Sequence, residues 1–190
     1  MDPEKLASTA YHEAGHAAVN AFLDVYGPSH FVRISVNDAV ISHSFIFLPI
    51  LNRSEAKRTI MFYLAGHAAQ VHSGYSLDLE DIEFLIEYDF YTAYLPEEEW
   101  RQITDEGRAL TIAEYLSNKS WTPRRILLLL YKWTHEVLDI PDVWNVVDNI
   151  AQRLITKGEI TDTDEYMELV DPVLWSWRQY PIWRRRLKLT

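Results

Sequence analysis

Three polar side chains interrupt a segment of small and apolar residues near the start of the chain. The segment, STAYHEAGHAAVNAFL, covers residues 8–23 and contains His12, Glu13 and His16 in the pattern HExxH. On a helix, residues four apart lie on the same face, so the two imidazoles can bind one metal ion. Zinc suits such a pair, because it accepts imidazole nitrogens and keeps one tetrahedral position for water at a catalytic site. Glu13 lies one step around the helix, where it can act as a general base toward that water.

The neighbours of these residues favour a metal site over two histidines on a solvated helix face. Apolar residues surround the polar stripe almost completely, which is typical of a buried helix. Buried imidazole and carboxylate groups are unfavourable without partners, and a metal ion supplies one. Gly15 costs about 1 kcal/mol relative to alanine inside a helix, so we expect another group to approach the backbone there. Asn20 continues the stripe too far along the helix to reach the same ion.

The third protein ligand is not determined by residue types alone. The chain has no cysteine, so the ligand is a histidine, an aspartate or a glutamate. The candidates are His30, His43, His67, His72, Asp78, Glu80, Asp81, Glu83 and Glu87. Several of these acids converge at the start of a predicted helix, but acids at that position also complement the helix dipole.

The elements predicted around this motif are mainly helical. Seven helices are expected: Pro3 to about Tyr26, 55–74, 78–94, 97–116, 124–138, 141–157 and 161–170. Ser54 is expected to cap the second, Thr122-Pro123 to open the fifth, and Thr161 or Thr163 to cap the last. Alternating β-branched and aromatic residues predict one hairpin, Phe31 to Phe47, which turns at Asn37-Asp38. The last twenty residues show no clear period. The predicted fold class is therefore mainly α, with a small β-hairpin beside the HExxH helix.

Composition limits the protein class. The chain has 190 residues, 48% of them hydrophobic, which suits one compact domain with a real core. Disulfides are excluded because there is no cysteine. No segment reaches the roughly 18 apolar residues of a membrane span, and the acidic start does not resemble a signal peptide. We therefore expect a cytoplasmic protein. A net charge of -10 argues against nucleic acid as the main partner.

The charge is unevenly distributed along the chain. Residues 75–106 contain eleven acids and one base, whereas residues 171–190 contain five bases and one acid. The basic segment also carries Trp175, Trp177, Tyr180 and Trp183. Such a mixture suits a membrane interface, an acidic partner or nucleic acid. The alternative is a tail that packs its aromatic side chains on its own core or on a neighbouring subunit, with its arginines in solvent.

Several segments, in order along the chain, resemble the peptidase domain of the FtsH family, the membrane-bound AAA+ zinc proteases. TAYHEAGHAAV is similar to the opening of that domain, and FVRISV with VISHSFIFLP is similar to its hairpin. YLAGHAAQVHSGYS resembles its LLGGRAAEE helix, and LEDIEFLIEYDFYTAYL resembles its NDIEQAT helix. VWNVVDNIAQRLITKGEITDTDEYMELV resembles its closing helices. The resemblance defines an FtsH-like domain over 1–170, followed by an aromatic and basic extension over 171–190.

This resemblance implies a ligand set and a mode of substrate binding. It implies a zinc ion held by His12, His16 and Asp81, with Glu13 as the catalytic base, and homo-oligomers, since family peptidase domains form hexameric rings. His67 stands where the family has an arginine. It either supports a metal ligand or is an ordinary buried or surface histidine, which is the more common fate of this residue type. The strand after the turn is expected to bind an extended peptide, unless it is an ordinary edge strand protected by its neighbours. Its candidate substrate-binding residues are Ile41, Ser42, His43, Ser44 and Phe45.

The chain also departs from the family. It contains no GxxxxGK[ST] nucleotide loop, and YLPEEEWRQ replaces the family's glycine-rich loop. We therefore predict a zinc metallopeptidase that cleaves peptides or unfolded proteins, alone or with a separate partner ATPase. The alternative is a catalytically silent protein that assembles with or regulates a full-length protease, although an intact Glu13 argues against it. A weaker possibility is an adaptor that contacts membrane surfaces through its tail.

Overall fold

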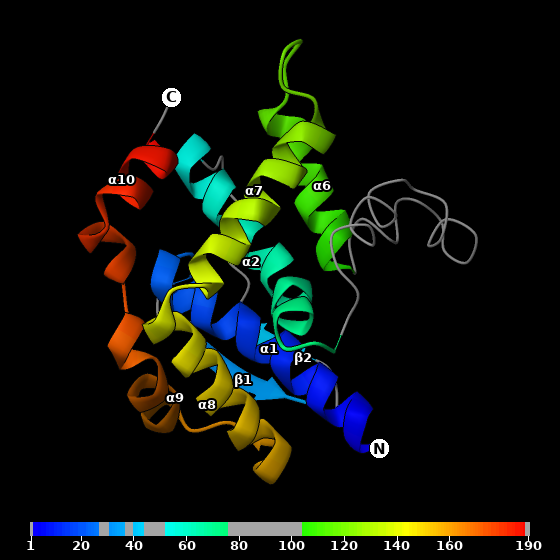
Figure 1. Ribbon diagram of the computed structural model, residues 1–190, viewed down its shortest axis with the longest axis vertical. Coiled ribbons are helices and arrows are strands. Elements are labelled where there is room, and N and C mark those ends of the chain that lie inside the picture. The colour runs from blue at the N-terminus through cyan, green and yellow to red at the C-terminus, as the bar shows by residue number, and fades with distance from the viewer. Residues whose placement is uncertain (1, 27–30, 37–39, 44–51, 76–103, 189–190) are drawn as a thin grey trace.

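The structure, a computed structural model, describes residues 2–26, 31–36, 40–43, 52–75 and 104–188 (Figure 1). These residues are mainly helical, as predicted. The α-helices are α1 (Pro3–Leu23), α2 (Arg53–His72), α6 (Asp105–Leu116), α7 (Pro123–Leu138), α8 (Pro141–Lys157), α9 (Thr163–Val170) and α10 (Pro181–Lys188). The strands are β1 (Phe31–Ser35), β2 (Val40–His43) and β3 (Glu159–Ile160), and short 3-10 turns cover Asp171–Val173 and Ser176–Gln179. In this part of the chain, no helix is both long enough and apolar enough to cross a membrane.

Helix α1, which carries HExxH, lies at the centre of the fold. It packs against α2 on one side and against α8 on the other, while α6 and α7 cover the far side of α2 (Figure 1). Most of α1 from Ala10 onward is buried, including Glu13, His16 and Asn20. The nearly continuous apolar surroundings of the motif therefore correspond to a helix buried on more than one side, as predicted.

Small residues allow α1 and α2 to approach closely. A Cβ atom added to Gly15 would lie 2.5 Å from the carbonyl oxygen of Ala65 and 2.5 Å from the Cβ atom of Ala69. Real side chains do not tolerate such separations, so only glycine fits at this crossing. The expected approach of another group to the backbone at Gly15 is thus confirmed, and that group is the backbone of α2.

The two predicted hairpin strands pair with each other, and a third strand joins them, while the predicted turn at Asn37-Asp38 lies outside the described residues. Strand β1 pairs antiparallel with β2 through Ile34 and Ile41, and also pairs with β3 through Ile34 and Ile160. The strand order β2-β1-β3 leaves β2 at an edge of the described sheet. The sequence did not predict β3, because a two-residue strand is too short to show an alternating pattern. The second half of the predicted hairpin strand lies outside the described residues.

Several predicted helix ends need correction. Helix α2 is capped by Asn52, not Ser54: the Asn52 side chain accepts from the Glu55 amide, and the Glu55 side chain accepts from the Asn52 amide. This reciprocal capping box satisfies two backbone donors, whereas a single cap satisfies one. Helix α9 is capped by Asp162 rather than by Thr161 or Thr163, since its carboxylate accepts from two amides. The Thr122-Pro123 start of α7 is confirmed.

The C-terminal extension packs onto the domain. Trp177 and Trp183 are buried in the core, whereas Trp175 remains 42% exposed. The extension is tied to the end of α1 by a hydrogen bond from the Trp175 amide to the Ala21 carbonyl and by an ion pair between Arg178 and Asp24 at 2.8 Å. Aromatic packing on the chain's own core is therefore the alternative that the structure bears out. Helix α10 was not predicted, because eight residues rich in arginine give little periodic signal.

The predicted helix over 78–94 and the first seven residues of the one over 97–116 lie outside the described residues. Of the latter, the structure describes α6, which begins at Asp105 behind a Thr104 cap. The acidic stretch over 75–106 is therefore described only at its two ends.

We expect Gly15→Ala to lower the stability of the protein. Overpacking against α2 costs about 1–3 kcal/mol, and the better helix propensity of alanine offsets about 1 kcal/mol of that loss. Urea unfolding followed by circular dichroism measures the difference. Glu168→Ala, at an exposed position of α9, serves as a control that leaves the midpoint nearly unchanged. A Gly15→Ala protein as stable as wild type would show that the helices can separate without cost.

Candidate metal centre

Three ligand atoms from two helices converge on one point. The Nε2 atoms of His12 and His16 lie 3.1 Å apart. An Oδ2 oxygen of Asp105, at the start of α6, lies 3.4 Å from the first nitrogen and 3.0 Å from the second. Among the described residues, these three form a group of metal-ligating side chains whose donor atoms are all within 4.8 Å of one another. The i, i+4 spacing of the histidines thus places both rings toward α6.

Hydrogen bonds on the opposite ring nitrogens orient both histidines. His16 Nδ1 lies 2.7 Å from the carbonyl oxygen of Phe62, so it must carry a hydrogen and donate. His12 Nδ1 lies 3.1 Å from Oε1 of Gln70, whose amide nitrogen in turn donates to Ser8. These bonds place the lone pair of each neutral ring on Nε2, the atom that faces the shared point. Partners of this kind fix the orientation of metal-binding histidines in proteins.

The donor set fits a small divalent cation. Two imidazole lone pairs and a carboxylate oxygen at these separations repel one another unless a positive charge lies between them. Zinc binds nitrogen and oxygen at 2.0–2.2 Å, so neighbouring ligands of a tetrahedral site lie about 3.3–3.6 Å apart. The three observed separations lie within a few tenths of an ångström of that range. The side chains of His12 and Asp105 are 25% and 26% exposed, so the site is open to solvent on their side.

Glycine is required at a second point of the helix crossing. A Cβ atom on Gly66 of α2 would lie 2.5 Å from Nε2 of His16 and 2.6 Å from Nε2 of His12. Any side chain at this position would therefore displace the two ligand atoms. The close packing of α1 on α2 and the geometry of the site depend on the same small residues.

The electrostatics of the metal-free site show the same need for a cation. Burial lowers the pKa of His12, but a hydrogen bond to Asp105 and the charges of Glu13 and Asp105 outweigh it and raise this pKa to about 9. Burial also raises the pKa of Asp105, but the charge of His16 and hydrogen bonds from both histidines hold it well below its usual range. A proton on His12 therefore balances the same carboxylate charges that a metal ion would balance.

Glu13 is a buried carboxylate within the electrostatic reach of the ligands. Its exposed fraction is 3%. Burial raises the pKa of Glu13, while the charges of His16 and His12 act in the opposite direction. A carboxylate with a raised pKa beside a metal site is suited to accept and return a proton.

Two other polar residues of α1 have structural roles. Tyr11 donates a hydrogen bond of 2.6 Å to Asp148 of α8, and its ring stacks on Trp144. This contact holds the HExxH turn of α1 against α8. Asn20, unassigned from sequence, accepts from the Tyr26 amide through its side chain and also hydrogen-bonds to Tyr166. It therefore stabilises the end of α1 rather than the metal centre.

The remaining predicted site residues have different outcomes. Asp81, Ser44 and Phe45 lie outside the described residues, so their roles stay predictions. Residues 41–43 lie on the edge strand β2. The ring of His67 lies 6.1 Å from that of Tyr131 on α7, and its supporting role stays a prediction. His67 lies on α2, and the side chain of α2 that hydrogen-bonds to His12 is that of Gln70.

Sequence reasoning missed Asp105. The local sequence around Asp105 is a Thr104 cap followed by two acids. Many ordinary helices begin with such a sequence. Asp105 lies 89 residues after His16 and outside the segments that resemble the family's ligand helices. Only the packing of α6 against α2 brings its carboxylate to the two histidines.

No protein-family model matches the chain, and no curated protein matches it either.

We expect Asp105→Asn to weaken zinc binding by at least about tenfold, because an amide oxygen lacks the negative charge of a carboxylate. Competition with a chromophoric chelator measures the affinity. Asp81→Asn, measured in parallel, tests the ligand that the family resemblance implies. Loss of affinity in Asp81→Asn alone would contradict the role of Asp105.

Zinc binding at pH 7 should release about one proton, because the raised pKa of His12 keeps its imidazole protonated in the metal-free protein. Isothermal titration calorimetry in buffers of different ionisation enthalpy counts that proton. A binding enthalpy that does not depend on the buffer would contradict a charged His12.

Proposed function

We propose that this protein is a zinc-dependent metallopeptidase that hydrolyses peptide bonds in peptides or unfolded proteins. The observation that carries the proposal is the convergence of His12, His16 and Asp105 beside the buried carboxylate of Glu13. A purely structural metal site needs ligands but has no use for an adjacent carboxylate base. The FtsH-like order of segments, stated above from sequence, points to the same activity.

The roles of the residues follow from their positions. His12, His16 and Asp105 would hold the ion. A zinc ion bound there supplies a Lewis acid that lowers the pKa of water and polarises a carbonyl. Glu13 takes a proton from the attacking water and returns it to the amine that leaves. Burial of Glu13 supports this exchange, since a raised pKa makes the protonated acid a usable intermediate.

Strand β2 is the proposed place for the substrate backbone. It lies at an edge of the described sheet and contacts α1. An extended peptide can add to such an edge through main-chain hydrogen bonds, which do not depend on sequence. A broad preference for unfolded chains follows, because a folded substrate cannot present an extended segment.

Zinc is proposed over other divalent metals because of the donor types. Two imidazoles and one carboxylate form a mixed nitrogen and oxygen set, which zinc accepts in a four-coordinate arrangement. Magnesium and calcium favour sites made of oxygen ligands only. Assembly into homo-oligomeric rings and cooperation with a partner ATPase are proposed from the resemblance alone.

Glu13→Gln should reduce peptide cleavage by about 10²- to 10⁴-fold, the usual contribution of a general acid-base, while zinc content stays near one ion per chain. Cleavage of a fluorescently labelled unfolded protein, together with elemental analysis, measures both properties. Glu4→Gln, an exposed change of the same chemistry on α1, is the matched control and should retain full activity.

Two outcomes would contradict the proposal. If wild type binds zinc but cleaves no peptide or unfolded protein, the catalytically silent regulator becomes the better explanation. If Glu13→Gln cleaves as fast as wild type, the base is another residue.

A further inference from the structure

Gln70 of α2 contacts the ring nitrogen of His12 that faces away from the candidate metal position. Its Oε1 atom lies 3.1 Å from Nδ1 of His12, whereas Asp105 contacts Nε2 of the same ring. The Gln70 side chain is therefore not placed to bind the ion itself. It is placed to decide how the ring presents its other nitrogen to the ion.

Ser8 determines which end of the Gln70 amide faces His12. The Nε2 atom of Gln70 lies 2.8 Å from Oγ of Ser8 and 3.4 Å from the backbone carbonyl oxygen of the same residue. A hydroxyl group can donate or accept, but a carbonyl oxygen can only accept, so the NH₂ end of the amide belongs on the Ser8 side. The amide oxygen then faces His12, and it can only accept. Nδ1 of His12 must therefore carry a hydrogen.

This chain of hydrogen bonds selects the form of His12 that can bind a metal. A neutral imidazole carries its hydrogen on one nitrogen only, so a hydrogen on Nδ1 leaves the lone pair on Nε2. A flipped amide would present its NH₂ group to Nδ1 and would favour the opposite tautomer, whose hydrogen points at the ion position. Ser8 and Gln70 are 62 residues apart, so their contact exists only because α1 packs on α2.

Both ligand histidines have a neutral acceptor behind them. His12 faces the amide oxygen of Gln70, and His16 faces the backbone carbonyl oxygen of Phe62 at 2.7 Å. A carboxylate in such a place makes the imidazole a stronger donor to the metal, because its negative charge raises the basicity of the ring. The amide of Gln70 therefore orients His12 without adding the affinity that a negative charge would supply.

We propose that Gln70 is a positioning residue which, held by Ser8, sets the affinity of this centre for zinc. Its amide oxygen fixes the metal-binding tautomer of His12. Its neutrality keeps the affinity below that of a centre with a carboxylate at the same position, so the protein loads and releases zinc at a higher concentration of free zinc. This inference rests on the proposed function, in that it takes zinc as the occupant of the centre.

Two substitutions at Gln70 should change the zinc affinity in opposite directions. Gln70→Leu removes the acceptor and should weaken zinc binding by about tenfold or more, whereas Gln70→Glu adds a negative charge and should tighten it by about tenfold. Competition with a chromophoric chelator, on the whole chain after removal of bound metal, measures both dissociation constants. A residue that only packs against His12 would lose affinity, or keep it, in both variants.

Two further variants separate the orientation of the amide from the effect of charge. Ser8→Ala removes one of the two partners of the Gln70 NH₂ group and should weaken zinc binding by about threefold, the effect of one neutral hydrogen bond. Gln179→Glu adds the same charge at an exposed position of the C-terminal extension and should change the affinity by less than about twofold. Circular dichroism checks that each variant folds.

Three results would overturn the proposal. These are an unchanged zinc affinity in Gln70→Leu, no gain of affinity in Gln70→Glu, or an equal gain in Gln70→Glu and Gln179→Glu. If Gln70→Leu does not fold, the comparison of the two glutamate variants still decides. A protein that cleaves no peptide but shows the opposite changes in zinc affinity would remove the proposed peptidase activity and leave the role of Gln70 standing.

Discussion

The close contact between α1 and α2 is the constraint on which the rest of the structure depends. Gly15 faces the Ala65 carbonyl and Gly66 faces the two histidine rings, each at distances that no Cβ atom could share. A larger residue at either position would push the helices apart and move His12 and His16 away from Asp105. On its other side, α1 is held on α8 through Tyr11 and Asp148. The HExxH helix is therefore fixed between two neighbours, and its ligand atoms have little freedom to move.

Three polar side chains of α1, those of His12, His16 and Asn20, are tolerated in or near the core because each has a specific partner. The Nδ1 atoms of the two histidines are satisfied by the Phe62 carbonyl and by Gln70, while Asn20 satisfies the backbone at the end of its own helix. The Nε2 atoms and the Asp105 carboxylate remain directed at one another. Three electron-pair donors at this spacing are stable only with a positive charge among them, either protons or a metal ion.

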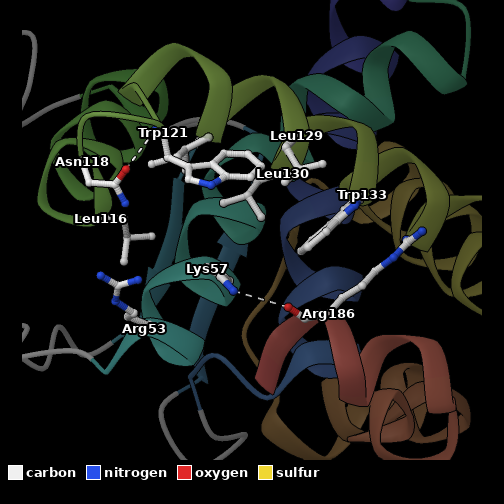
Figure 2. A pocket seen from close by; sticks show the side chains of 10 residues that line it. Arg53, Lys57, Leu116, Asn118, Trp121, Leu129, Leu130, Trp133 and Arg186 are labelled. Carbon is white, nitrogen blue, oxygen red and sulfur yellow. Dashed lines mark hydrogen bonds between the residues drawn. The ribbon is translucent and has the colours of Figure 1, made fainter. Parts of the chain in front are cut away.

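Helix α6 runs from the candidate metal centre to a cavity at its other end. At its first residue, Asp105 contributes negative charge to a cluster that favours a cation. At its last residue, Leu116 borders a cavity whose lining includes Arg53 and Lys57 (Figure 2). Both sites also use α2, which contributes Gly66 and Gln70 to the first and the two cations to the second. One pair of packed helices thus supports two chemically different environments at its two ends.

The sequence by itself determined the helical class, the hairpin, and the identity of His12, Glu13 and His16 as a set, because i, i+4 spacing and β-alternation are local properties of the chain. It also indicated, through Gly15, that another group approaches α1. Tertiary structure alone decided that Asp105 meets the histidines, that Gln70 orients His12, and that β3 joins the sheet. These contacts join residues separated by many tens of positions, and each of those residues occupies an unremarkable local context. Asp105 resembles any acid at a helix start, and only the packing of α6 on α2 makes its carboxylate a candidate ligand.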